Sequence, residues 1–161
     1  MNDRQDAEEY VRKQADWLRA HGGKRALDVG CGTGRHALYL DTISYQVCAT
    51  EEDETLLATA RQGAKKQFGL VDFENAPPDQ LPFADNGFDY VIAWNVLDKK
   101  DEAFARAVVS EIRRVLKPGK IFQGAVTAFT DAQVRVLLDG FEIADLSKAG
   151  EHAWRWTAKR H

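Results

Sequence analysis

The 161-residue chain has few of the features that identify several protein classes. Its two cysteines, Cys31 and Cys48, form no Cys-x-x-Cys pair and no Cys/His pattern with metal-ligand spacing. This argues against a disulfide framework and gives no indication of a zinc site or other metal site. A reducing, cytoplasmic location is therefore expected.

Long hydrophobic runs and an excess of basic charge are also missing. The longest apolar stretches, such as residues 90–94, are too short to cross a bilayer. The opening sequence MNDRQDAEEY is charged from the start and lacks the apolar core of a secretion signal, so neither a membrane protein nor a secreted one is expected. The formal net charge is −3, so no nucleic-acid partner is expected.

The composition is that of an ordinary globular protein, with 44% hydrophobic and 29% charged residues. The chain contains no repeats and no linker-like segments, so we expect a single domain over residues 1–161. Apolar residues at helical spacing predict an N-terminal helix over residues 3–20, within a segment 1–22 that Gly22 and Gly23 bring to an end. The core is expected to span residues 25–161.

Strands and helices are predicted to alternate along the core. The expected strands are 25–29, 46–50, 70–73, 88–94, 121–126, 141–146 and 152–157, and the expected helices are 35–40, 53–66, 101–116 and 131–138. Alternation of this kind indicates a parallel sheet with helices on both faces and a ligand crevice at the carboxyl ends of its strands. The connection between the last two expected strands is too short for a parallel crossover, so these two strands are expected to pair antiparallel. The predicted fold is therefore α/β, a doubly wound, mostly parallel seven-stranded Rossmann-like sheet with an antiparallel last strand.

A glycine-rich loop follows the first strand. Gly30, Gly32 and Gly34 allow close approach of a ligand to the backbone and present N–H groups at a helix start, although a tight turn that binds nothing has the same pattern. Arg35 stands where a dinucleotide-binding loop has its third glycine, which argues against nicotinamide and flavin cofactors.

Several segments together resemble the class I S-adenosylmethionine-dependent methyltransferases. Asp28 and the glycines resemble that family's first motif, and a strand ending in Glu51 resembles its second strand. Further segments similar to the family occur in the same order at residues 56–61, 81–92 and 111–120. The resemblance covers residues 26–126, and the remaining tail fits the family's last two strands.

This resemblance implies S-adenosylmethionine as the cofactor. Asp28 would hold its amino group, and Glu51 would accept hydrogen bonds from the two ribose hydroxyls. The alternatives are that Asp28 only braces the turn and that Glu51 is a solvated surface acid. The cofactor-binding residues implied are Asp28, Gly30, Cys31, Gly32, Gly34, Glu51, Glu52, Asn75 and Trp94.

The chain departs from the family pattern at the adenine end of the site. Glu52 stands where the family usually has an apolar residue against the adenine ring. Pro77 and Pro78 replace residues that supply a carboxylate and an N–H group, which proline lacks. A shifted loop would let Asn75 or Asp79 substitute for them.

Candidate catalytic residues are few. Asp98 follows the fourth predicted strand and is a weak candidate for a general base, but Asp98 or Asp101 is expected to cap the next helix instead. His36, just inside the helix after the glycine loop, is expected to be exposed. Three residues are expected to be structural: Asp89, Trp154 and Trp156.

Little chain is left to enclose a substrate, because residues 127–130 alone separate the fifth strand from the next helix. The leading hypothesis is a methyltransferase acting on a small molecule, with closure of the cleft by a second subunit, as in a homodimer, left open. A non-catalytic, methyltransferase-like binding or regulatory module with a degenerate adenine pocket is the alternative. A nicotinamide oxidoreductase is the third hypothesis, and Arg35 in place of the third glycine argues against it.

Overall fold

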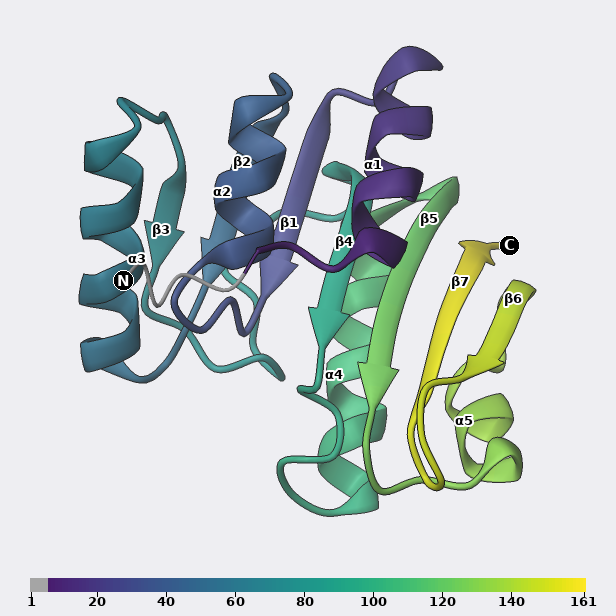
Figure 1. Cartoon of the computed structure of the whole chain (residues 1–161). Coiled ribbons are helices and arrows are strands. Elements are labelled where there is room, and N and C mark those ends of the chain that lie inside the picture. The colour runs from purple at the N-terminus through teal and green to yellow at the C-terminus, as the bar shows by residue number, and fades with distance from the viewer. Residues whose placement is uncertain (1–5) are drawn as a thin grey trace.

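The computed structural model describes residues 6–161 and contains one seven-stranded sheet with helices on both faces (Figure 1). The strands lie in the order β3-β2-β1-β4-β5-β7-β6. Five strands, β1 to β5, pair in parallel, and β7 pairs antiparallel with both of its neighbours. The predicted doubly wound sheet with an antiparallel last strand is confirmed. No helix in the described part of the chain is both long and apolar enough to span a membrane.

The elements follow the predicted alternation closely. The helices are α1 (Glu9–Ala20), α2 (Arg35–Thr42), α3 (Glu54–Lys66), α4 (Glu102–Val115) and α5 (Asp131–Leu137). The strands are β1 (Arg25–Val29), β2 (Gln46–Thr50), β3 (Asp72–Glu74), β4 (Phe88–Trp94), β5 (Leu116–Val126), β6 (Phe141–Lys148) and β7 (Trp154–Arg160).

Several predicted boundaries are wrong, among them the last strand, which covers Trp154–Arg160 rather than 152–157. The first helix begins at Glu9 rather than at residue 3; residues 3–5 lie outside the described part of the chain, and residues 6–8 are not helical. The third strand covers 72–74 rather than 70–73, because Gly69 still closes the end of α3 by donating to the carbonyl of Ala64. The fifth strand begins at Leu116, and its pairing with β4 is interrupted between Phe88 and Tyr90.

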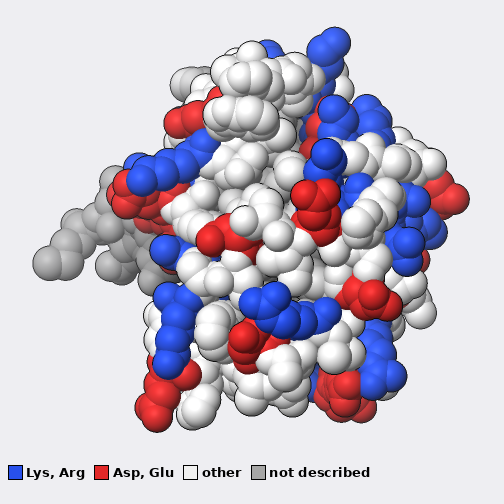
Figure 2. Space-filling model, turned by 90° about the vertical axis from the view of Figure 1, so that its right-hand side faces the viewer, with Lys and Arg blue, Asp and Glu red and all other residues white. Residues whose placement is uncertain are grey.

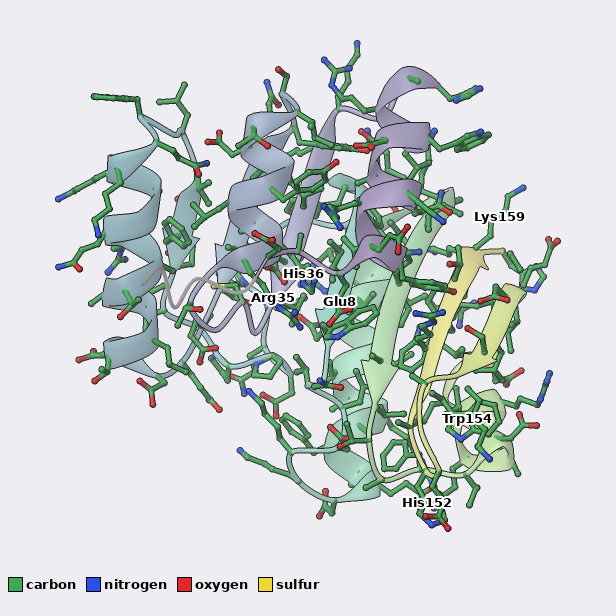
Figure 3. The ribbon with its side chains drawn as sticks, viewed as in Figure 1. Glu8, Arg35, His36, His152, Trp154 and Lys159 are labelled. Carbon is green, nitrogen blue, oxygen red and sulfur yellow. The ribbon has the colours of Figure 1, made fainter. Side chains whose placement is uncertain are left out.

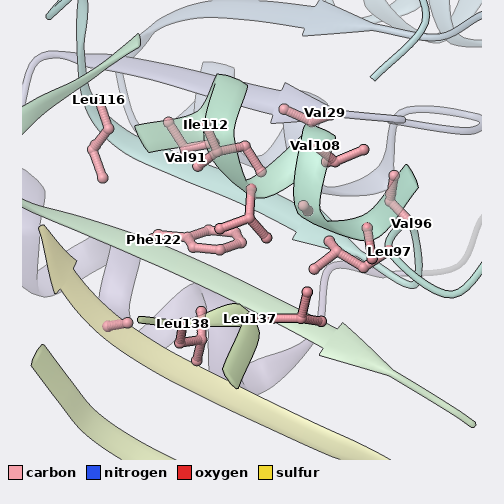
Figure 4. Packing of buried hydrophobic residues seen from close by; sticks show 14 of the residues in the cluster. Val29, Val91, Val96, Leu97, Val108, Ile112, Leu116, Phe122, Leu137 and Leu138 are labelled. Carbon is pink, nitrogen blue, oxygen red and sulfur yellow. The ribbon is translucent and has the colours of Figure 1, made fainter. Parts of the chain in front are cut away.

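The two faces of the sheet carry separate hydrophobic clusters. Helices α1 and α2 pack with Ala60 of α3 on one face, against Ala26, Val47 and Ile92 of the sheet. Helices α4 and α5 cover the other face, where Val108 and Ile112 contact the region of Val91 and Phe122 (Figure 4). Strand β4 is buried almost throughout because helices cover it on both sides, as its apolar sequence, broken only by Asp89, predicts.

Candidate functional site

The chain reverses its direction of winding between β1 and β4. The crossover after β1 leads through α2 to β2, whereas the crossover after β4 leads through α4 to β5. The loops at the carboxyl ends of β1 and β4 therefore diverge, and ligands bind at such switch points in open α/β sheets. A cavity of about 270 Å³ lies between these loops.

The glycine loop forms one wall of this cavity. Gly30 and Gly32 both have left-handed backbone angles, with φ of 65° and 58°. A Cβ on Gly30 would lie 2.8 Å from Val96, whereas a Cβ on Gly32 would meet no atom within 4 Å. Gly30 is therefore required for packing, and the space beside Gly32 is open to a ligand.

Asp28 lies at the end of β1 beneath this loop and is 2% exposed. Its Oδ2 accepts a hydrogen bond from the Ala37 amide at 3.1 Å, and no described residue donates to its Oδ1. Burial raises the pKa of this carboxyl to about 7, against the lowering effect of the Ala37 amide and of the Arg35 charge. Asp28 thus braces the start of α2, as one of its two interpretations predicts, and its Oδ1 has no donor among the described residues.

Glu51, at the end of β2, is not a solvated surface acid, because it is only 2% exposed. Its Oε1 accepts from the Gly32 amide at 3.0 Å, and its Oε2 accepts from the Asp53 amide at 2.9 Å. Each carboxylate oxygen can accept a further hydrogen bond. Glu51 therefore fixes the glycine loop against β2 while both of its oxygens remain able to bind hydroxyl groups.

Asn75 follows β3 and braces the neighbouring loop. Its Nδ2 donates to the backbone carbonyls of Glu51 at 3.3 Å and Glu52 at 3.2 Å. These two acceptors fix the orientation of the amide, so its Oδ1 points away from them and has no partner among the described residues. Pro78 is buried and Glu52 is exposed. The amide of Asn75 is thus the polar group that this segment offers beside the two prolines.

The segment before α1 contacts the start of α2 at Arg35 and His36, which line the cavity. The Glu8 amide donates to His36 Nε2 at 3.2 Å, and Glu8 Oε1 pairs with Arg35 Nη1 at 3.0 Å; Figure 3 shows these three residues together. The His36 ring meets the edge of Trp94, with 5.5 Å between centroids. His36 is 3% exposed, so the prediction of an exposed histidine is wrong. Burial lowers its pKa to about 3 and keeps the ring neutral.

The weak catalytic candidate Asp98 braces another loop. Its Oδ2 accepts from the backbone amide of Thr127 at 2.6 Å and from its hydroxyl at 2.9 Å. Asp101, the other expected cap, accepts from the Phe104 amide and caps α4. Asp98 is not among the residues that line the cavity.

Three residues that the sequence marks as structural lie away from this cavity. Asp89 accepts from the Lys24 and Arg25 amides and pairs with Lys117 at 3.0 Å, which confirms its structural role. Trp156 is buried in the core, as expected. Trp154 packs against the same cluster but is only partly buried.

The structure gathers most of the predicted cofactor residues in one place. Asp28, Gly30, Cys31, Gly32 and Trp94 line the cavity. The remaining predicted residues are not among those that line it: Gly34 caps α2, Glu51 bonds to the Gly32 amide, and Glu52 and Asn75 lie in the loops after β2 and β3, joined by a hydrogen bond. Sequence reasoning missed that Arg35, His36, Asn95 and Lys99 also line the cavity. Arg35 and His36 directly follow the glycine motif, which is the signal that could have identified them.

Comparison with known proteins identifies similar sequences. Residues 26–119 match a family model described as a methyltransferase domain. An O-methyltransferase of Aspergillus sclerotiorum is 34% identical over 115 residues, which are 70% of this chain and 43% of that protein. A demethylmenaquinone methyltransferase of Geobacillus kaustophilus is 37% identical over 102 residues, which are 60% of this chain and 42% of that protein. The chain thus spans less than half the length of these two relatives.

Solved structures share the fold at low sequence identity. TehB from Haemophilus influenzae superimposes with a TM-score of 0.83 at 14% identity, over 96% of this chain and 63% of its own. Magnesium protoporphyrin IX methyltransferase from Synechocystis PCC 6803, solved with bound SAM, superimposes with a TM-score of 0.78 at 23% identity. The match covers 95% of this chain and 79% of that protein. These likenesses concern the arrangement of the sheet and its helices.

Proposed function

The chain belongs to the methyltransferase domain family, and on this premise we propose that it is an S-adenosylmethionine-dependent methyltransferase acting on a small molecule. The observation that carries the proposal is the buried Asp28 carboxyl, whose Oδ1 has no partner among the described residues and whose cavity is bounded by an open glycine loop. A buried carboxylate with a free oxygen is stabilised by a cation, and the amino group of an amino acid supplies one.

The residues around the cavity fit the parts of S-adenosylmethionine. Asp28 Oδ1 would accept from the ammonium group, and Lys99, which lines the same cavity, would pair with the carboxylate. Glu51 would accept from the two ribose hydroxyls through the lone pairs that the Gly32 and Asp53 amides leave free. Asn75 Oδ1 would accept from the adenine amino group, in place of the carboxylate that the prolines remove.

The remaining predicted contacts surround these anchors. Cys31 and Trp94 line the cavity, and Gly34 holds the turn into α2. Burial raises the pKa of the Cys31 thiol, so this side chain stays neutral. Glu52 is exposed beside Asn75, where its charge stays in solvent at the edge of the adenine position.

When bound, S-adenosylmethionine supplies an electrophilic methyl group, which the acceptor's lone pair takes while sulfur keeps the electron pair of the broken C–S bond. The protein's contribution is to hold the acceptor in line, and positioning of this kind supplies several kcal/mol of catalysis. His36 is a poor base, because the Glu8 amide occupies its Nε2 and its pKa is about 3. Asp98 keeps one free oxygen but remains a weak candidate.

Thermal unfolding with S-adenosylmethionine or S-adenosylhomocysteine tests the proposal, with NADH as the control. A ligand at about one hundred times its dissociation constant adds roughly 2.7 kcal/mol of stability. We expect an increase in the unfolding midpoint on the order of 5–10 °C with either adenosyl ligand and none with NADH. No increase at millimolar adenosyl ligand would contradict the proposal, and binding without turnover on any acceptor would favour the non-catalytic alternative.

The affinity for S-adenosylhomocysteine is expected to rise with pH up to about pH 7. The ligand's ammonium group needs the ionised form of Asp28, whose pKa is raised to about 7, so binding below that pH must first remove a proton. Affinity should therefore increase roughly tenfold per pH unit below pH 7 and level off above it. Calorimetric titrations between pH 5.5 and 7.5 measure this slope, and a flat profile would show that Asp28 does not hold the ammonium group.

A further inference from the structure

A second cavity, of about 380 Å³, opens on the other side of the end of β4. It shares Trp94 and Asn95 with the first cavity, so the two sites meet where β4 ends. Its outer wall is the β6–β7 hairpin, through Lys148, Trp154 and Arg155. In Figure 3, Trp154 lies near the turn of this hairpin, at the carboxyl edge of the sheet.

The guanidinium of Arg155 is held in a fixed position at this wall. Its Nε donates to Ser147 Oγ at 3.1 Å, and its Cζ lies 4.5 Å from the centroid of the Tyr10 ring. Ser147 and Tyr10 are in turn both hydrogen bonded to Asp145 Oδ2, at 3.1 and 2.6 Å. No described residue accepts from the two Nη atoms of Arg155. A fixed guanidinium with both terminal nitrogens free is suited to bind a carboxylate through two parallel hydrogen bonds.

The charges around this cavity favour an anion. Lys148 is exposed at the rim and pairs with no described residue. Among the described residues that line this cavity, Glu8 is the acidic one. Its charge is compensated by Arg35, whose Nη1 lies 3.0 Å from Glu8 Oε1. Basic and acidic side chains are interspersed over the surface that Figure 2 shows, with no broad basic patch on that face.

The lining also contains the polar residues Asn95 and Thr127 and a set of apolar side chains. Ala125, Val126, Ala149 and Ala153 contribute small side chains, and the two partly exposed tryptophans, Trp94 and Trp154, contribute aromatic surface. A cavity of this volume, with aromatic and small apolar side chains beside charged groups, is in the range of sites for small organic molecules.

We propose that this second cavity is the acceptor site, and that the acceptor is a small carboxylic acid with an apolar body, such as an aromatic acid. Arg155 binds its carboxylate through the two Nη atoms, and Lys148 attracts the anion at the rim. The assignment as acceptor site rests on the proposed function, whereas the preference for a carboxylate rests on Arg155 and the residues that hold it.

The test compares 1-naphthoate with its neutral analogue 1-naphthamide, by calorimetric titration with and without saturating S-adenosylhomocysteine. We expect 1-naphthoate to bind roughly tenfold or more tightly than the amide, because the anchor is a charge-assisted, bidentate contact. Arg155→Gln should remove this preference, weakening 1-naphthoate by about tenfold or more with little change for the amide. Arg155→Lys keeps the charge but loses the paired donors, and should retain only part of the preference.

Lys159→Gln is the matched charge control. Lys159 is exposed on the same strand, at the opposite end of the sheet from the hairpin turn (Figure 3). Its replacement should leave both naphthalene ligands and S-adenosylhomocysteine unaffected.

The outcomes separate the two proposals. Equal binding of 1-naphthoate and 1-naphthamide, no binding of either, or an equal effect of Arg155→Gln and Lys159→Gln would overturn the carboxylate site while S-adenosylhomocysteine binding stands. If the protein binds no S-adenosylhomocysteine but still binds 1-naphthoate more tightly than 1-naphthamide through Arg155, the carboxylate site is supported. The proposed function is then overturned instead. Unchanged S-adenosylhomocysteine affinity in the Arg155 variants shows that the cofactor cavity is intact.

Discussion

Replacing Asp28 by asparagine is expected to weaken S-adenosylhomocysteine binding by roughly a hundredfold and, at pH 8, to stabilise the ligand-free protein. The first effect arises because a hydrogen bond to a charged group contributes about 1.5–3 kcal/mol, and asparagine offers the ammonium group no charge. The side chain keeps its size, and its carbonyl oxygen can still accept from the Ala37 amide. The turn into α2 should therefore persist.

The second effect follows from the raised pKa of Asp28. Because burial raises this pKa to about 7, the carboxyl contributes stability below its unfolded pKa and loses that contribution as the pH rises towards 7. At pH 8 the ligand-free protein holds a buried charge without a cation, and asparagine removes it. Thermal unfolding of the ligand-free proteins at pH 5 and pH 8 measures this effect. Asp28→Asn should have a higher unfolding midpoint than wild type at pH 8 but not at pH 5.

Asp89→Asn is the matched control for both effects. Asp89 is also a buried carboxylate on a central strand, but it lies at the start of β4, at the opposite edge of the sheet. Two backbone amides and Lys117 lower its pKa despite its burial, so its charge stabilises the fold. Asp89→Asn should destabilise the protein at pH 8 and leave S-adenosylhomocysteine affinity unchanged. Equal ligand affinity in wild type and Asp28→Asn would contradict the assignment of Asp28.

The sequence predicts the fold well where burial leaves a clear pattern. Residues 25–29, 46–50 and 88–94 are strands with the predicted limits, because each is mostly apolar and buried along most of its length. The short edge strand at 72–74 is misplaced, since only one neighbour and little burial define it.

The candidate site is predictable only where it is local in sequence. Asp28, Gly30 and Gly32 are in one motif, and Glu51 ends the next strand, so parallel pairing brings them together. The contacts of Glu8 with Arg35 and His36 join segments 27 and 28 positions apart, and the apolar pattern carries no information about them. Arg155 is far more remote from Tyr10 along the chain, and its placement depends on how the hairpin folds back along β5.

Gly124→Ala is expected to destabilise the protein by about 3 kcal/mol, at the upper end of the cost of overpacking a core. Gly124 lies in β5 opposite Trp156 of β7, and a Cβ at this position would lie 2.2 Å from the indole Cζ2. Trp156 is 1% exposed and cannot move aside. The backbone preference acts in the other direction, because alanine in a strand is more favourable than glycine by roughly 0.5–1 kcal/mol. Packing is the larger of the two effects and sets the sign.

A second substitution distinguishes the clash from any other cause. Phenylalanine at position 156 lacks the atoms equivalent to Cζ2 and Cη2, two of the three indole atoms that the new Cβ would meet. It also removes the indole Nε1, a buried donor without a partner among the described residues. In the Trp156→Phe background, Gly124→Ala should therefore be close to neutral or slightly stabilising. Thermal unfolding of the four proteins in this cycle measures the coupling directly, and an equal loss in both backgrounds would show that something other than the indole requires glycine at position 124.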